Sequence, residues 1–131
     1  MKTLQITSNS QVEMIDISAE VCRVIRDARV ADGMAVVFTP HTTAAITINE
    51  NADPDVCYDM LMAINKIVPM QDGYHHLEGN SAAHLKSSLF GASETLIIKN
   101  GEVVLGTWQG IYFCEFDGPR RRRVQIQVVG Q

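Results

Sequence analysis

The chain lacks several features that would assign it to a familiar class of protein. No apolar run approaches the roughly 20 residues of a membrane span, and residues 1–17 alternate with polar side chains instead of forming a signal peptide. The net charge is −4, and Arg120–Arg123 is the only basic run. A phosphate-tracking surface needs a basic stripe. We therefore expect neither a membrane nor a nucleic acid as a partner.

Cysteine is also scarce. The three cysteines, Cys22, Cys57 and Cys114, are odd in number, far apart and without CxxC spacing. Free cysteines pack as small hydrophobic residues and persist in reducing compartments, so we expect reduced thiols in a cytoplasmic protein. No linker, repeat or low-complexity tract interrupts the 131 residues, of which 46% are apolar. The sequence predicts a single domain over residues 1–131.

Hydrophobic periodicity predicts about eight short strands and two or three helices. Ser18 is the expected N-cap of a first helix that Gly33 ends, and Asp53-Pro54 is expected to start a second. A short third helix should end near Gly91. The expected strands cover residues 3–7, 12–17, 34–39, 44–49, 95–99, 103–105, 108–116 and 124–129. Together these elements predict a compact two-layer, β-rich α+β sandwich.

Turn residues predict two hairpins in the last third of the chain. Asn100-Gly101 is the sharpest short-range hairpin signal. Asp117-Gly118-Pro119 lies between two apolar runs and suggests a second hairpin with a longer loop. Turn chemistry alone does not determine the order of the strands.

Histidines mark the first candidate site. His41, His76 and His84 lie in three polar, irregular segments, and Glu78 would share a side with His76 in an extended chain. Imidazole is a common metal ligand and general acid or base. Their spacing matches no local metal motif, so the fold must bring the segments together. The alternative is that they are ordinary surface or capping histidines.

Two further polar clusters precede predicted helices. Asn49, Glu50 and Asp53 lie where an apolar strand meets a helix, a common place for ligands. Capping and turn formation would explain them equally well. Gly79-Asn80-Ser81 offers backbone N–H groups to an anion, with Lys86 as a possible addition.

The only tryptophan lies in an unusual strand entrance. Thr107, Trp108 and Gln109 are bracketed by two glycines, as if the backbone approached a ligand closely; a core or interface anchor is the alternative. Glu115 alternates with apolar neighbours and therefore needs a partner. The arginine run that follows is typical of a solvated strand start, and a phosphate clamp is the alternative.

Five segments, in chain order, resemble the secondary thiamine-phosphate synthase family, long described as uncharacterised. The likeness covers nearly the whole chain, and the tryptophan and histidine–glutamate–glycine motifs are the specific ones. His76 matches the second of these, whereas His75 falls at a variable position. The segments are Pro40–Thr43, Ile48–Pro54, Tyr74–His84, Leu105–Ile111 and Cys114–Arg120.

The resemblance implies a β-rich α+β fold, a homotrimer with polar motifs near subunit boundaries, and a weak transferase activity. That reaction joins an aminopyrimidine diphosphate to a thiazole phosphate and releases pyrophosphate. The strand carrying Ile111, Tyr112, Phe113 and Phe116 also favours a buried subunit contact. The ligand-binding set then includes Thr42, which follows His41 in the first motif.

The residues themselves favour metal-assisted chemistry on a small phosphorylated compound. Three imidazoles are a softer ligand set than Mg²⁺ prefers, so we expect zinc or a similar divalent metal on His41, His76 and His84, with one position open. Glu78 would orient a ligand or act as a base. Two alternatives remain: a non-catalytic homotrimeric module that binds a metal or anion, and histidines that bind phosphate directly, without a metal.

Overall fold

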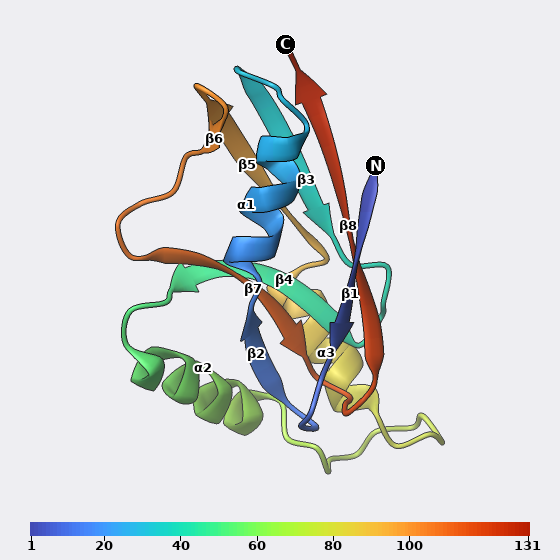
Figure 1. Cartoon of the computed structure of the whole chain (residues 1–131). Helices are drawn as coiled ribbons and strands as arrows, with labels where there is room; N and C mark the ends of the chain where they lie inside the picture. The colour runs from blue at the N-terminus through green and yellow to red at the C-terminus, as the bar shows by residue number, and fades with distance from the viewer.

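The structure, a computed structural model, describes residues 1–131 and contains two antiparallel sheets with three helices (Figure 1). Sheet A has the strand order β1-β8-β3-β5-β6, and sheet B has the order β2-β7-β4. The strands are β1 (Lys2–Thr7), β2 (Glu13–Asp16), β3 (Gly33–Phe38), β4 (Ala44–Glu50), β5 (Ser93–Lys99), β6 (Glu102–Val103), β7 (Gln109–Glu115) and β8 (Arg121–Gly130). The helices are α1 (Ser18–Asp27), α2 (Pro54–Ile67) and α3 (Ser81–Phe90). The predicted α+β class is confirmed.

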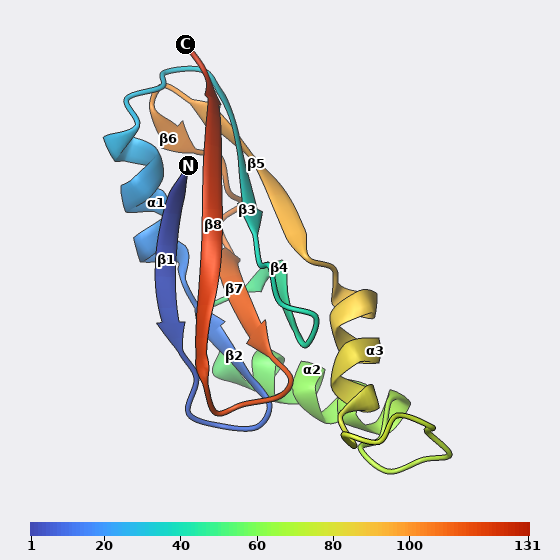
Figure 2. The same cartoon turned by 90° about the vertical axis from the view of Figure 1, so that its right-hand side faces the viewer.

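The main core lies between sheet A, sheet B and α1. Val21 and Ile25 of α1 pack with Phe113 of β7 and Ile126 of β8, and all four side chains are buried. Figure 2 shows α1 on one side of sheet A. On the opposite side, no helix covers the parts of β3 and β5 that lie above α3. No helix is long and apolar enough to cross a membrane.

The predicted strand β7 is not available for a subunit contact. Ile111, Phe113 and Phe116 are fully buried within the chain's own core, and Tyr112 is nearly so. The large apolar side chains that suggested an interface are therefore satisfied inside one protomer.

One predicted hairpin is confirmed and the other is wrong. Asn100 and Gly101, with φ of 52° and 79°, join β5 to β6 in a tight turn. By contrast, β7 pairs with β2 and β4 in sheet B, whereas β8 pairs with β1 and β3 in sheet A. The turn between them binds another loop, because the Gly118 N–H donates to the Gln11 carbonyl. The chain consequently crosses between sheets at this turn.

The helix boundaries correct two expectations and confirm a third. Ser18 is the first residue of α1 and not its cap, since its hydroxyl accepts the Ile111 N–H at 2.8 Å. α1 ends at Asp27, and Arg29, not Gly33, takes the left-handed conformation with φ of 55°. Asp53 caps α2 as predicted, accepting the Asp55 N–H at 2.9 Å.

Candidate functional site

A polar hollow of about 430 Å³ lies at one end of the molecule, where three connections meet. These are the β3–β4 loop, the segment before α3 and the β7–β8 turn. Pro40 is the only apolar residue that lines the hollow. Its eleven residues, called the histidine pocket below, are Pro40, His41, Thr42, Thr43, His76, Glu78, Asn80, His84, Asp117, Arg120 and Arg122.

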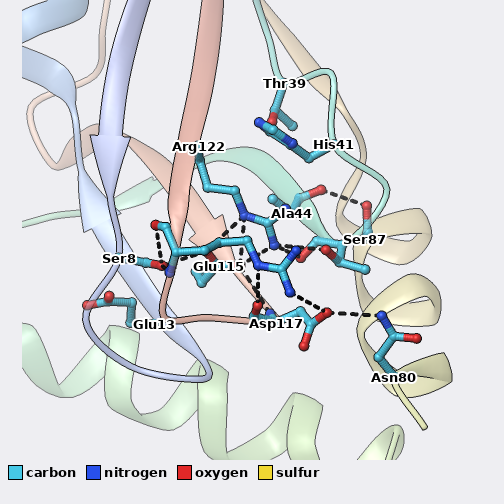
Figure 3. Close-up of polar contacts among 12 residues, drawn as sticks. Ser8, Glu13, Thr39, His41, Ala44, Asn80, Ser87, Glu115, Asp117 and Arg122 are labelled. Carbon is cyan, nitrogen blue, oxygen red and sulfur yellow. Dashed lines mark hydrogen bonds and ion pairs between the residues drawn. The ribbon is translucent and has the colours of Figure 1, made fainter. Parts of the chain in front are cut away.

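Arg122, which lines the histidine pocket, forms a buried ion pair with Glu115 (Figure 3). Arg122 is 3% exposed and Glu115 is fully buried. The Arg122 Nε lies 2.9 Å from Glu115 Oε1, while Nη2 donates to Oε2 and, at 2.8 Å, to Thr43 Oγ1. Burial opposes ionisation of Glu115, but hydrogen bonds from Arg122 and Ser8 outweigh it and hold its pKa below the ordinary value. Glu115 thus remains charged, and Arg122 is the partner that its position among apolar neighbours predicted.

A second chain of contacts joins the β7–β8 turn to α3. The Asn80 amide donates to Asp117 Oδ2 at 3.0 Å, and Arg120 Nη2 donates to the same oxygen at 3.1 Å (Figure 3). Ser87 Oγ donates to the Ala44 carbonyl at 2.6 Å, which ties α3 to the start of β4. These contacts fix the three walls relative to one another.

His41 is held in a defined tautomer. Its Nε2 accepts the backbone N–H of Arg123 at 2.9 Å, so the proton of the neutral ring lies on Nδ1. Burial, followed by the positive charges of Arg122 and Arg123, lowers the His41 pKa below its ordinary value. His41 is therefore a neutral ring with one donor, Nδ1–H, left for a ligand.

His76, His84 and Glu78 form a second group in the pocket. The two imidazole rings meet edge to face with their centroids 5.6 Å apart. His76 Nε2 lies 3.9 Å from Glu78 Oε1, and the Glu78 side chain is 75% exposed. Glu78 thus lies beside His76, as predicted, although residues 77–78 form a turn and not the extended segment that the prediction assumed. The histidines also border a neighbouring hollow that Tyr74 and Leu85 help to line.

The N-terminus of α3 opens beside these histidines. Asn80 is its N-cap but makes no side-chain capping bond: its NH₂ group donates to Asp117, and its Oδ1 is buried without a hydrogen-bond partner. No acceptor in the chain binds the Ser81 N–H, and Ser81 lines the neighbouring hollow, whereas Ala82 is fully buried. Gly79 has φ of 79°, a conformation that favours glycine. The predicted anion-binding junction therefore has a free donor.

The other predicted ligand-binding residues lie elsewhere. Asn49 and Glu50 end β4, a strand length of roughly 20 Å from the pocket end at Ala44. The Asn49 side chain accepts the Glu50 N–H. With Asp53 acting as a cap, the turn and capping alternatives describe this cluster.

The tryptophan segment joins that distant cluster. Gln109 pairs with Glu50 in the β4–β7 ladder, and its side chain accepts the Gly106 N–H at 2.8 Å. Thr107 and Trp108 are exposed, and Trp108 is 62% accessible, so it is no core anchor. None of these residues lines the histidine pocket.

Lys86 was expected near the anion junction, but it faces α2. Its side chain is fully buried, and Nζ donates to Asn65 Oδ1 at 2.6 Å. Burial lowers the Lys86 pKa. Lys86 is therefore a contact between α2 and α3.

The predicted three-histidine zinc shell is not formed in the structure. His41, His76 and His84 do line one pocket, but no group of three His, Cys, Asp or Glu side chains is placed to hold a metal ion. The Nε2 of His41 is already occupied by the Arg123 N–H. The donor set suits a hydrogen-bonded ligand better than a metal.

The sequence interpretation missed Arg120, Arg122 and Asp117. The expected solvated strand start is correct for Arg121 and Arg123, which are exposed, but not for Arg122. Strand alternation could have revealed this, because Arg122 shares a face with Val124 and Ile126. A buried carboxylate at 115 and an arginine on an apolar face are natural partners.

The fold and pocket define a small α+β protein with one histidine-rich polar site that three loops assemble. The sequence profile of the UPF0047 protein YjbQ-like family matches residues 2–131. The chain belongs to this family. The UPF0047 protein YugU of Bacillus subtilis is 53% identical, with 99% of each chain covered.

Two solved structures of other organisms share the fold. A conserved YjbQ/UPF0047-family protein of Clostridium acetobutylicum has a TM-score of 0.97 and 51% identity, covering 98% of this chain and all of that one. A YbjQ-like protein of unknown function from Sulfolobus solfataricus has a TM-score of 0.96 at 28% identity, covering 99% of this chain and 96% of that one.

These relatives correct the family and function expected from the sequence. The matched family and its named members are UPF0047 proteins, and nothing among them points to thiamine-phosphate synthase. The expected family and the thiamine-phosphate synthase function that it implied are therefore wrong.

Proposed function

We propose that the chain binds a small ligand through a phosphate or carboxylate group in the histidine pocket. The observation that carries this proposal is the convergence of hydrogen-bond donors on a hollow whose lining is polar apart from Pro40. His41, His84 and Arg120 line it, and Asn80, the N-cap of α3, brings the N-terminus of that helix to its edge. Helix N-termini and imidazole or guanidinium groups are common partners of anions.

Donor placement, more than net charge, supports binding. The lowered pKa of His41 keeps it neutral, so it offers a directed N–H. Arg122 already donates to Glu115 and Thr43 and acts as a wall. Ser81 follows the pocket-lining Asn80 and adds a free backbone N–H group where the helix dipole favours negative charge.

Phosphate should raise the thermal stability of the protein as mass action requires. Thermal melts with phosphate, set against chloride at equal ionic strength, should show a rise that follows ligand concentration. Loss of one donor in His84→Ala should weaken phosphate binding about tenfold, the equivalent of one charge-assisted hydrogen bond. His75→Ala is the matched control, because His75 lies outside the pocket. No rise in wild type at tens of millimolar phosphate would contradict the proposal.

We also propose that the protein assembles as a homotrimer through the outer face of sheet A. Met34, Val36 and Phe38 of β3 project there beside Ile97 of β5 and Val129 of β8, and each is at least 37% exposed. Thr95, Gln125 and Gln127 lie among them on the same face and are uncharged, whereas its charged residues lie at the strand ends. Depletion of charge around exposed apolar side chains is typical of an interface.

Light scattering should give three times the 14.5 kDa chain mass. Val36→Lys should lower that mass toward one chain, because it buries an unpaired charge in the contact. Val104→Lys changes an equally apolar residue outside this face, since Val104 follows β6 and is 51% exposed. A monomeric wild type at micromolar concentration would contradict the assembly.

A cytoplasmic location is part of the same proposal. Cys22, Cys57 and Cys114 are free thiols, as expected in a reducing compartment. Localisation of a tagged full chain would test it.

A further inference from the structure

The charges of the histidine pocket are nearly all paired. Arg122 is neutralised by Glu115, and Arg120 lies 3.1 Å from Asp117. Glu78 is the remaining charged side chain of the lining, and its only ion-pair partner is His76, at 3.9 Å. When His76 is neutral, the pocket therefore carries a carboxylate without a cationic partner.

This balance limits the kinds of anion that the pocket suits. The donors of His41, His84 and α3 satisfy the lone pairs of a phosphate or carboxylate, but they bring no excess positive charge at a pH where the rings are neutral. An anion bound there adds negative charge to the hollow that holds Glu78. Like charges that share a site repel each other, and a cation on the ligand relieves the repulsion.

We propose that the ligand is zwitterionic, with its anionic group on the donors of His41, His84 and α3 and its ammonium group against Glu78. The inference rests on the proposed anion binding and deepens it by naming the ligand class. Both halves of the ligand face one hollow of about 430 Å³, so a small molecule reaches both. Glu78 then selects for the cation, and the helix N-terminus holds the anion.

The test compares two ligands with the same phosphate group and the same two-carbon chain. Phosphoethanolamine carries an ammonium group, and ethyl phosphate lacks it. Calorimetric titrations are run at pH 8, where an ordinary imidazole is neutral. Wild type should bind phosphoethanolamine about two- to fivefold more tightly than ethyl phosphate, as expected of a partly exposed ion pair. Glu78→Gln should abolish this preference and bind ethyl phosphate more tightly than wild type does.

Asp72→Asn is the control variant. Asp72 is an exposed carboxylate in the same segment but outside the pocket, and it should leave the preference unchanged. Equal affinity of wild type for the two ligands, or a preference that persists in Glu78→Gln, would overturn the zwitterion proposal while leaving anion binding intact. If neither ligand nor inorganic phosphate binds wild type, both proposals are wrong.

Discussion

Glu115→Gln should destabilise the protein by about 3–5 kcal/mol, the cost of leaving a buried charge without its partner. The Arg122 guanidinium is almost completely buried and donates to both Glu115 oxygens. Glutamine would remove the countercharge and place an NH₂ group against these donors. Ser8 Oγ and the Asp117 N–H would also lose a carboxylate acceptor. Urea unfolding of wild type and variant measures the difference.

Glu102→Gln is the matched control for Glu115→Gln. Glu102 pairs with Arg26 at 3.6 Å on the surface, where both side chains are more than half exposed. Such pairs contribute about 0–1 kcal/mol. Equal effects of the two substitutions would contradict the role given to the buried pair.

Acid should also destabilise the protein through the buried pair, because it protonates Glu115. The pKa of Glu115 lies below its ordinary value when folded, so its contribution is present above the unfolded pKa of about 4.3 and is lost as pH falls through the folded pKa. Glu115→Gln should lack this part of the acid dependence.

Gly118→Ala should destabilise the protein by about 1–3 kcal/mol and weaken phosphate binding. A Cβ at Gly118 would overlap the Ser10 carbonyl oxygen and stand 2.8 Å from Ser8 Oγ. The backbone could relieve this overlap only by shifting the β7–β8 turn, and that turn holds the pocket residues Asp117 and Arg120 in place. Urea unfolding and calorimetry would measure the two effects.

Gly73→Ala provides the control, because nothing lies within 4 Å of a Cβ at Gly73. It should change stability by less than about 0.5 kcal/mol. A Gly118→Ala variant as stable as Gly73→Ala would show that the turn can relax and would remove its positioning role.

Local signals predicted the elements of this fold but not their pairing. Asp53-Pro54 and Asn100-Gly101 act through neighbouring residues only, so both features are confirmed. The partners of β7 and β8 depend on contacts with segments more than 60 residues away, including the bond from Gly118 to Gln11. Turn composition carries no information on such contacts.

The candidate site divides in the same way. Polar segments around His41, His76 and His84 were expected to converge, and they do. The segments around Asn49 and Trp108 are also polar and irregular in sequence. They lie at the end of sheet B opposite to Ala44 and Glu115, because β4 and β7 run along the whole sheet. Which polar strand end belongs to a site depends on strand direction, and that was not determined by the sequence pattern.

Anomalous diffraction would show directly whether the histidine pocket holds an anion. Crystals grown with selenate, a heavier analogue of sulfate, should show one strong anomalous peak within hydrogen-bond distance of His41 Nδ1, His84 and the N–H group of Ser81. The peak should be weaker in His84→Ala crystals of the same form that are grown at the same selenate concentration. Selenate found only at other surface sites in wild type, with the pocket open to solvent, would contradict anion binding in the histidine pocket.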